Sequence, residues 1–506
     1  MITVDSINTR LFRDIALNTL QVLVNQVLGV FIFLLLSRSL DKDIYGELNW
    51  SLAVLTLITT ILSLRLEQIV VRNVAAGKDP SAMLTLFLAH NAVTGLIFLG
   101  GLLAASFLFP AFFHRHYILW ILSISQLLTF FSLPFRQLAT GQSAFGWLTA
   151  ISTVSNIIRC GWIGWLAAFS AITLPRVLII FILSAGVEFI LGGYIVVRKL
   201  KVPFSTRQNF ATYQQLIKES LPQVGLVFLN AGIARIDWIL MGFLSTRVHT
   251  AEYSFAYRAY EFSPLPLLIL APFLLNSFSR YFSGPGSGSA LTGGPAHTPA
   301  PAWLGLFVRL SAIFATLLPL WGMLLWAPLV DLLTHHKYGQ VNNLTFLLLS
   351  VCIPFQYLIN ICWSAEFAAN RLGRIFAITA VTAVIVVAGD CLLIPAYGGQ
   401  GAAMAYLVSM IVQYGLYSRI SIFAAARKEW PWQMFMAIAI AAASGEGALL
   451  LTDSVPLQLG IATVLYALLT WGSGRLGGKD ITRLRQHLGQ RQRHPLYPIP
   501  GKMAGK

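Results

Sequence analysis

Apolar residues run along this chain in long stretches, and short polar segments separate them. Many of the stretches reach the roughly 20 residues that a helix needs to cross the hydrocarbon core of a bilayer. The pattern predicts an all-α integral membrane protein with fourteen spans, at residues 15–37, 44–64, 82–109, 117–135, 146–169, 176–197, 220–244, 252–279, 303–328, 341–367, 375–395, 400–424, 432–452 and 455–473. An even number of spans places both termini on one side of the membrane.

Charged residues cluster inside one predicted hairpin, residues 220–262, whose two apolar runs are joined by the polar turn Ser245–Thr250. Charge inside a bilayer costs at least a few kcal/mol per group. This hairpin nevertheless carries four charged residues: Arg235, Asp237, Arg258 and Glu261. They form either a structural ion-pair network or a substrate or ion site, since intramembrane ionisable residues are functional candidates by default.

The depths of the four charges predict how they pair. At about 1.5 Å rise per residue, Asp237 and Arg258 lie roughly 12 and 10 Å from the turn, and Arg235 and Glu261 roughly 15 Å. Antiparallel neighbours would therefore pair Asp237 with Arg258 and Arg235 with Glu261. Arg258 and Glu261 also share one helix face, because they are three residues apart.

Prolines interrupt the second helix of this hairpin, where SPLPLLILAP includes Pro264, Pro266 and Pro272. Each proline removes a backbone donor from the helix. The eighth span is therefore expected to be kinked, or broken where it lines a cavity.

The hairpin repeats the start of the chain. With a shift of 208 positions, LLSRSLDKDIYGEL lies over FLSTRVHTAEYSFA. Duplicated halves with a site between them are a common plan of secondary transporters. In the linker between the halves, Phe210, Tyr213, Leu216 and Ile217 are expected to face lipid. The predicted parts are an N-terminal lobe at 1–200, a cytoplasmic amphipathic linker at 201–219, a C-terminal lobe at 220–428 with a flexible loop at 281–301, two further spans at 429–474, and a basic cytoplasmic tail at 475–506.

Composition excludes a soluble protein, because the mean hydropathy is +0.72, 57% of the residues are hydrophobic and only 11% are charged. The net charge of +16 does not indicate nucleic acid, since the basic residues gather in short loops and in the tail. With the N-terminus inside, 24 Lys and Arg residues fall on inner segments and 6 on outer ones. This positive-inside pattern predicts that both termini are cytoplasmic. The apolar run 11–36 is too long for a cleavable signal peptide.

A tight turn is predicted at residues 394–405, IPAYGGQGAAMA. Pro395 is expected to end one helix, and Gly398, Gly399 and Gly401 let the backbone turn sharply. The alanines that follow, at 402, 403 and 405, open the next helix with side chains small enough to pack closely.

This Pro-x-Tyr-Gly-x-x-Gly-Ala-Ala pattern resembles the polysaccharide transporters, or O-antigen flippases, of the multidrug/oligosaccharidyl-lipid/polysaccharide (MOP) superfamily. Other stretches agree with the likeness, which covers most of residues 10–430: ARIDWILMGFLS followed by AEYSFAYRAYE, LDKDIYGELNWSLAVL, and ANRLGR. The resemblance implies two six-helix lobes, as in MATE transporters, around a central cavity that opens alternately to either side. Two extra helices would follow at the C-terminal end.

The resemblance also implies an activity. The substrate would be an oligosaccharide on an undecaprenyl pyrophosphate carrier, moved across the bacterial cytoplasmic membrane. An ion gradient would drive transport, and the chain has no ATP-binding motif, so no cofactor is expected. Membrane lipids would be partners, as would a polysaccharide polymerase or export machinery by family analogy, but not nucleic acid.

These expectations assign roles to the intramembrane polar residues. A pyrophosphate needs fixed cations in a wet cavity, and the candidates are Arg159, Arg235 and Arg258. Sugars need hydrogen-bonding side chains, and the candidates are Asn18, Gln21, Asn25, Gln356 and Asn360. Coupling to protons or sodium needs a titratable carboxylate, and the candidates are Asp237, Glu261 and Asp390. Each has a structural alternative as an interhelical polar bond.

Three other functions compete with this one. A MATE-type drug or cation antiporter would have an acidic or aromatic cavity rather than three arginines. A flippase for lipid II, the peptidoglycan precursor, shares the fold and the pyrophosphate, but would carry more cationic residues in its first two helices than the uncharged stretch 18–26. A membrane enzyme would need a sizeable outer loop, whereas every predicted outer segment is short and no catalytic constellation is present. No enzymatic activity is expected, and no metal site, since the four cysteines lie in apolar runs without ligand spacing.

Overall fold

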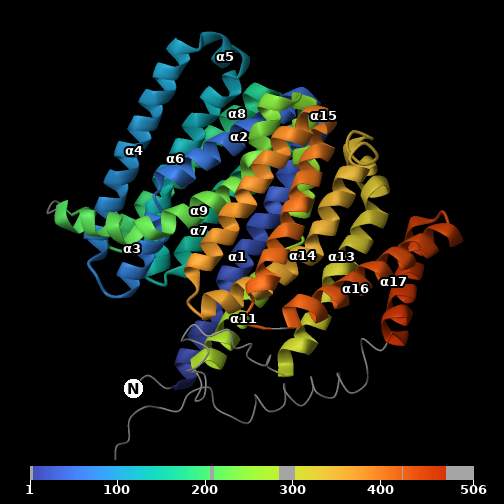
Figure 1. Cartoon of the computed structure of the whole chain (residues 1–506). Helices are drawn as coiled ribbons and strands as arrows, with labels where there is room; N and C mark the ends of the chain where they lie inside the picture. The colour runs from blue at the N-terminus through green and yellow to red at the C-terminus, as the bar shows by residue number, and fades with distance from the viewer. Residues whose placement is uncertain (1–3, 206–209, 284–301, 424, 474–506) are drawn as a thin grey trace, which may run out of the picture. The chain divides into compact units, whose positions relative to one another are not determined.

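The computed structural model of the chain describes residues 4–205, 210–283, 302–423 and 425–473, with only the backbone described for residues 4–20. All regular secondary structure in these ranges is helical (Figure 1). Most of the predicted loop 281–301 and the whole predicted tail 475–506 lie outside the described residues. The helices are α1 Val4–Ser39, α2 Lys42–Leu62, α3 Leu66–Ala75, α4 Pro80–Leu108, α5 Pro110–Arg115, α6 Tyr117–Gly141, α7 Phe145–Phe169, α8 Leu174–Tyr194 with the π-helical turn Ile195–Lys199, α9 Phe210–Leu244, α10 Arg247–Tyr260, α11 Leu265–Ser283, α13 Ala302–Thr334, α14 Asn343–Ala368, α15 Leu372–Ile420, α16 Ala425–Leu451 and α17 Val455–Gly472.

Eleven of the described helices are long and apolar enough to cross a membrane, so the all-α membrane class is confirmed. The predicted count of fourteen is not confirmed, and three features account for the difference. The fifth predicted span is α7, which carries Asn156 and Arg159 and is not among the eleven. The eighth is divided into α10 and α11, and the eleventh and twelfth are the two arms of α15, which meet at a kink at Gly398 and count as one element.

The predicted interruption of the eighth span is present as a break. Helix α10 ends at Tyr260 and α11 begins at Leu265, so residues 261–264 belong to neither helix. Pro264 lies in the break, and Pro266 is the second residue of α11. A missing N–H is tolerated there, because the first N–H groups of a helix have no acceptor within it.

Helix α15 turns sharply at Gly398, which has φ 54° and ψ −129°. Glycine adopts this conformation without steric cost. The first arm continues through Pro395 and ends at this kink, so the predicted turn is present but lies at Gly398, three residues after Pro395. The two arms of α15 pack closely, because a Cβ on Gly389 would lie 2.8 Å from that of Ala405 and Ala402 is completely buried.

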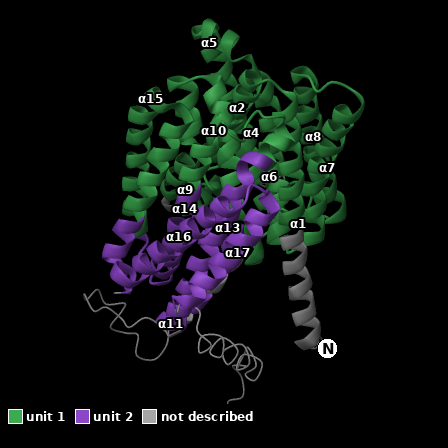
Figure 2. Ribbon diagram, turned by 90° about the vertical axis from the view of Figure 1, so that its right-hand side faces the viewer, with its two compact units in different colours: residues 1–262, 329–349, 373–413 green, residues 263–328, 350–372, 414–506 purple. Residues whose placement is uncertain are grey.

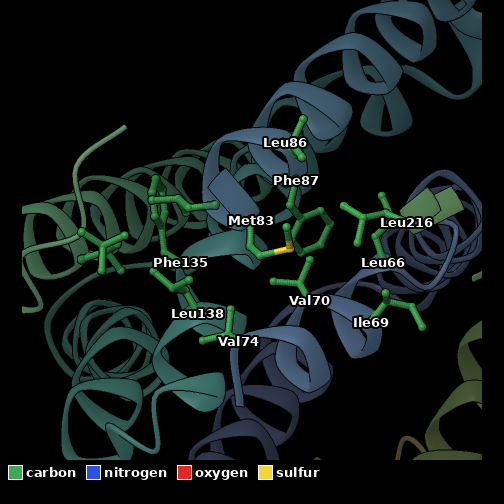
Figure 3. Close-up of a cluster of buried hydrophobic side chains, with 13 residues drawn as sticks. Leu66, Ile69, Val70, Val74, Met83, Leu86, Phe87, Phe135, Leu138 and Leu216 are labelled. Atoms are coloured by element: carbon green, nitrogen blue, oxygen red, sulfur yellow. The ribbon is translucent and has the colours of Figure 1, made fainter. Parts of the chain in front are cut away.

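The segment at 210–219, predicted as a lipid-facing linker, forms the first turns of α9. Leu216 is buried in a cluster with Val70 of α3 and Phe87 of α4 (Figure 3). The hydroxyl of Tyr213 lies 2.9 Å from Nδ1 of His90, and burial raises the pKa of Tyr213. The prediction that Leu216 faces lipid is wrong, because the amphipathic pattern instead matches a protein surface formed by α3 and α4.

The chain groups into two compact units, residues 1–262, 329–349 and 373–413, and residues 263–328, 350–372 and 414–506 (Figure 2). In the second unit, Oγ1 of Thr316 on α13 lies 2.7 Å from the hydroxyl of Tyr466 on α17. Leu320 of α13 and Ala448 of α16 pack in one apolar cluster with Tyr466. The lobes at 1–200 and 220–428 stay a prediction.

In the first unit, the hairpins α1–α2 and α9–α10 are built alike, with two residues between the helices of each. Their second helices begin at 42 and 247, an offset of 205 rather than the 208 of the sequence alignment. Helix α2 packs directly on α10 and α9. A Cβ on Gly46 would overlap the carbonyl oxygen of Arg247, and a Cβ on Gly242 would overlap the ring of Trp50.

A buried ion cluster joins the same helices. The carboxylate of Glu47 on α2 is buried, with Oε1 2.7 Å from Nδ1 of His116 and Oε2 3.0 Å from Nε of Arg247. Arg247 also donates from Nη2 to the carbonyl of Arg115 at 2.6 Å. One carboxylate thus ties α2 to the start of α10 and to the residue between α5 and α6.

Replacing Gly46 with alanine is expected to lower the free energy of unfolding by about 1–3 kcal/mol, because the added methyl group overlaps backbone atoms. Thermal unfolding of the purified protein in detergent measures this loss. Gly29→Ala is the matched control, since a Cβ on Gly29 meets nothing within 4 Å. Alanine there is expected to be neutral or to stabilise the helix by up to about 1 kcal/mol. Equal unfolding midpoints for Gly46→Ala and wild type would contradict the close contact.

Candidate functional site: a charged cluster on α9, α10 and α15

Charged side chains of α9 and α10 meet in the first unit. Nη1 of Arg235 lies 2.9 Å from Oε1 of Glu261, which confirms the pairing predicted from depth. Nη1 of Arg258 lies 2.8 Å from the other carboxylate oxygen, Oε2, as the three-residue spacing predicted. A single carboxylate therefore bridges two guanidinium groups. We refer to Arg235, Glu261 and Arg258 as the Arg–Glu–Arg cluster.

The indole ring of Trp238 supports both arginines. Cζ of Arg235 lies 4.8 Å from the ring centroid and Cζ of Arg258 lies 5.6 Å from it, within the range of cation–π contacts. Trp238 is 1% exposed, whereas the side chains of Arg235, Glu261 and Arg258 are 20%, 25% and 40% exposed. The cluster thus lies at the border between packed interior and accessible surface. Because hydrocarbon cannot solvate two arginines, we expect its accessible side to face water.

Asp237 is buried and has different partners from those predicted. The hydroxyl of Tyr253 donates to Oδ2, and the backbone N–H of Trp238 donates to Oδ1 at 2.8 Å. Within the described part of the chain Asp237 forms no ion pair with Arg258, so that predicted pairing is wrong. Depth along two helices does not set the direction of a side chain, and Arg258 reaches instead toward Glu261, the C-cap of its own helix.

Asp390 lies on the first arm of α15 and is completely buried. Among the described contacts, neither of its carboxylate oxygens has a hydrogen-bond partner. Asp390 is close enough to Asp237 and Tyr253 for their charges to interact. The fold therefore brings together two of the three predicted coupling carboxylates, which are far apart in sequence. The third, Glu261, belongs to the Arg–Glu–Arg cluster.

An aromatic wall beside these acids was not predicted from the sequence. The ring centroids of Tyr257 on α10 and Tyr406 on α15 are 5.9 Å apart, and the hydroxyl oxygens of Tyr260 and Tyr406 are 3.4 Å apart. The spacing of Tyr253, Tyr257 and Tyr260 places all three on one helix face, so this part of the wall was visible as a pattern. Tyr406 joins it only through the fold.

Arg159, the third predicted cation, has separate partners within the first unit. Its Nε donates to Oγ of Ser184 at 3.1 Å, and its Cζ lies 4.4 Å from the ring centroid of Phe181, both on α8. Glu188 of the same helix is close enough for its charge to interact with that of Arg159. The structure thus brings Arg235 and Arg258 together around one carboxylate and holds Arg159 against α8.

The predicted sugar-binding residues of α1 are bonded to α7. Nε2 of Gln21 donates to Oγ of Ser152 at 2.7 Å, and Nδ2 of Asn156 donates to Oδ1 of Asn25 at 3.0 Å. These are the interhelical polar bonds of the structural alternative. A role of Gln21 and Asn25 toward sugar stays a prediction.

The other predicted sugar-binding residues are distributed differently. Gln356 and Asn360 lie four residues apart on one face of α14, in the second unit. Oδ1 of Asn360 is buried and has no partner among the described contacts. The side chain of Asn18 lies outside the described residues.

Residues 11–275 match the family of polysaccharide biosynthesis proteins. The chain belongs to this family. The resemblance to this family is thereby confirmed, and the match includes the stretches at 40–55 and 234–261 but not the glycine-rich turn at 394–405. No curated protein matches the sequence.

Solved structures of MOP superfamily transporters share the fold of this family member. The lipid II flippase MurJ, in an inward closed conformation, superimposes with a TM-score of 0.68 at 12% identity, covering 90% of this chain and 98% of MurJ. An inward-facing multidrug resistance MATE transporter gives 0.58 at 13% identity, covering 83% and 96%. A MOP transporter from Pyrococcus furiosus, described as having a binding pocket of reverse polarity, gives 0.56 at 12% identity, covering 86% and 96%. At these identities the likeness establishes the fold alone, and the predicted fold class, that of MOP transporters, is confirmed.

Proposed function

We propose that this protein is a flippase that moves an oligosaccharide linked to undecaprenyl pyrophosphate across the bacterial cytoplasmic membrane by alternating access, with both termini in the cytoplasm. Its family is that of polysaccharide biosynthesis proteins, and its fold is that of MOP membrane transporters. The observation that carries the proposal is the Arg–Glu–Arg cluster. Two arginines held on one tryptophan, among membrane-spanning helices and partly exposed, are suited to bind an anion.

The charge of the cluster distinguishes the candidate substrates. A diphosphate diester carries two negative charges and several acceptor oxygens, which guanidinium groups bind in a fixed geometry. A cation or drug antiporter needs the opposite charge at its site. Lipid II carries the same diphosphate, so the cluster is compatible with it as well, and the experiment below separates the two. A polymerase or export machinery as partner stays a prediction.

We infer that Asp237 and Asp390 bind the coupling ion. Two carboxylates buried close together, one of them without a hydrogen-bond donor, are costly to charge unless a proton or a cation neutralises them. Arg235 interacts with the charges of both Asp237 and Glu261. It is therefore placed to transmit a change at the ion site to the anion site.

The experiment uses a strain deleted for this gene, in which lipid-linked oligosaccharide is traced on each face of the membrane. Without the protein, the lipid-linked sugar is expected to accumulate on the cytoplasmic leaflet, and wild type restores export. Arg235→Gln and Arg258→Gln are each expected to slow export at least about tenfold, because each removes a charge-assisted contact to the diphosphate. Arg176→Gln is the control, since Arg176 is exposed in the first turn of α8 and bonds to Ser170 and Ala171 in the segment just before that helix.

Other outcomes of this experiment would replace the proposal. Intact sugar export with raised sensitivity to cationic drugs would establish an antiporter. Accumulation of lipid II in place of the sugar-linked lipid would establish the peptidoglycan precursor as substrate. Accumulation that both arginine variants relieve fully would keep the function and remove the site.

A further inference from the structure

The Arg–Glu–Arg cluster already contains an anion, the carboxylate of Glu261. Its two oxygens lie 2.9 Å from Nη1 of Arg235 and 2.8 Å from Nη1 of Arg258. A phosphate group bound by the same arginines would make the same charge-assisted contacts. A phosphate that binds these same two Nη1 groups therefore displaces the Glu261 carboxylate from them.

We propose that Glu261 is a tethered competitor of the substrate's diphosphate, which leaves the arginine pair when substrate binds and returns to release it. This inference rests on the proposed function, because it concerns the same site. With Glu261 in place, the three side chains carry a net charge of +1, so the empty site never presents two uncompensated cations. A carboxylate attached to the same helix as Arg258 also has a high effective concentration at the pair.

For transport, the consequence is that the Glu261 carboxylate can replace the bound diphosphate, so the substrate is released instead of staying bound to the arginines. Two arginines without a competitor would bind a diphosphate tightly on either side of the membrane, and tight binding slows release. The returning carboxylate replaces the contacts that the departing substrate loses. Substrate affinity is thereby lowered, and the site is reset to its resting charge.

Glu261 is placed where it can leave. It is the C-cap of α10, with its backbone N–H bonded to the carbonyl of Tyr257 at 2.9 Å, and the first residue of the break before α11, so helical turns flank it on one side only. Its side chain is 25% exposed, so water can solvate the released carboxylate. The arginines do not have to follow, because the ring of Trp238 supports both. Asp237, by contrast, is buried and bonded to Tyr253, and is not placed to exchange.

The test measures binding of inorganic pyrophosphate to the purified full-length protein in detergent by isothermal titration calorimetry. Glu261→Gln keeps the shape of the side chain and removes its charge, so pyrophosphate is expected to bind about tenfold more tightly than to wild type. In the leaflet assay above, the same variant is expected to export more slowly, because release becomes limiting. Glu261→Asp keeps the charge, but its shorter side chain reaches only one arginine, so a smaller tightening is expected. Pyrophosphate binding to Glu261→Asp tests the proposal if Glu261→Gln does not fold.

Glu219→Gln is the matched control, because Glu219 is also acidic and ion-paired, to Arg72, but lies about 24 Å along α9 from Arg235. Its pyrophosphate affinity is expected to equal that of wild type. If both Glu261 variants bind pyrophosphate as tightly as wild type or more weakly, Glu261 does not compete with the diphosphate, although the arginines can still bind an anion. Tighter binding with export as fast as wild type would overturn its role in release. Absence of pyrophosphate binding in wild type and Glu261→Gln alike would remove the anion site itself, and with it the proposed substrate.

Discussion

Replacing Asp390 with leucine is expected to abolish export while raising the thermal stability of the protein. Asp390 is completely buried, and neither of its oxygens has a hydrogen-bond partner among the described contacts. An unsatisfied buried polar group costs about 1–3 kcal/mol of stability. Leucine has a similar size and no polar atom, so the unfolding midpoint should rise by a corresponding amount. Thermal unfolding in detergent and the leaflet assay measure the two effects.

The opposite signs of the two effects make this prediction decisive. If Asp390 and Asp237 bind the coupling ion, removing one carboxylate removes the ion, whatever happens to the fold. Thr382→Val is the control on the same helix, because the Thr382 hydroxyl is buried and bonds only to the carbonyl of Ile378 one turn away. Its export is expected to match wild type. A variant Asp390→Leu that exports normally would show that the carboxylate has no part in coupling, and one that unfolds more easily would show that it has partners in the folded state.

Replacing Arg247 with methionine is expected to lower the free energy of unfolding by about 3 kcal/mol, since removal of one partner leaves the other charge buried. Glu47 would keep only His116, and its Oε2 would lose the contact at 3.0 Å. This loss of unfolding free energy is at the lower end of the range for breaking a buried ion pair, because the Arg247 side chain is about a third exposed. The unfolding midpoint of the purified variant measures it.

A second substitution separates charge burial from lost packing. Glu47→Gln in the Arg247→Met background removes the stranded charge while keeping the shape of the side chain, and is expected to recover more than half of the loss. Arg115→Gln is the control, because the Arg115 side chain is exposed and only its backbone carbonyl contacts Arg247. A change below about 0.5 kcal/mol is expected for it. Equal destabilisation in the single and double variants would show that packing, and not the buried carboxylate, is what Arg247 supports.

The local pattern of apolar residues, prolines and glycines in the sequence was sufficient to predict much of the fold. Long apolar runs identified the membrane class, and the prolines at 264 and 266 marked the break between α10 and α11. The glycines and alanines after Pro395 indicated two closely packed helix arms, although the turn is made by Gly398 alone. Residues on one helix or in one hairpin are constrained by helix geometry, so the contacts of Glu261 with Arg258 and Arg235 could be predicted from spacing and depth.

Contacts between distant helices could not be predicted in the same way. Spacing indicated that Asp237 and Arg258 lie at similar depths, but the Asp237 carboxylate accepts from Tyr253. Residues 210–219 have an amphipathic pattern that lipid and a protein surface satisfy equally, and only the position of α3 decided between them. The burial of Glu47 with His116 and Arg247 joins three segments that no local pattern relates.

The sequence by itself therefore determined the all-α membrane class, which residues place charge in apolar segments, and which family the chain resembles. These properties depend on hydropathy and helical periodicity, which act over a few turns of chain. Only the tertiary structure decided that Asp390 lies beside Asp237, that Tyr406 completes the wall begun on α10, and that the indole ring of Trp238 supports both arginines. Those arrangements depend on how helices far apart in sequence pack together and on the direction in which each side chain leaves its helix.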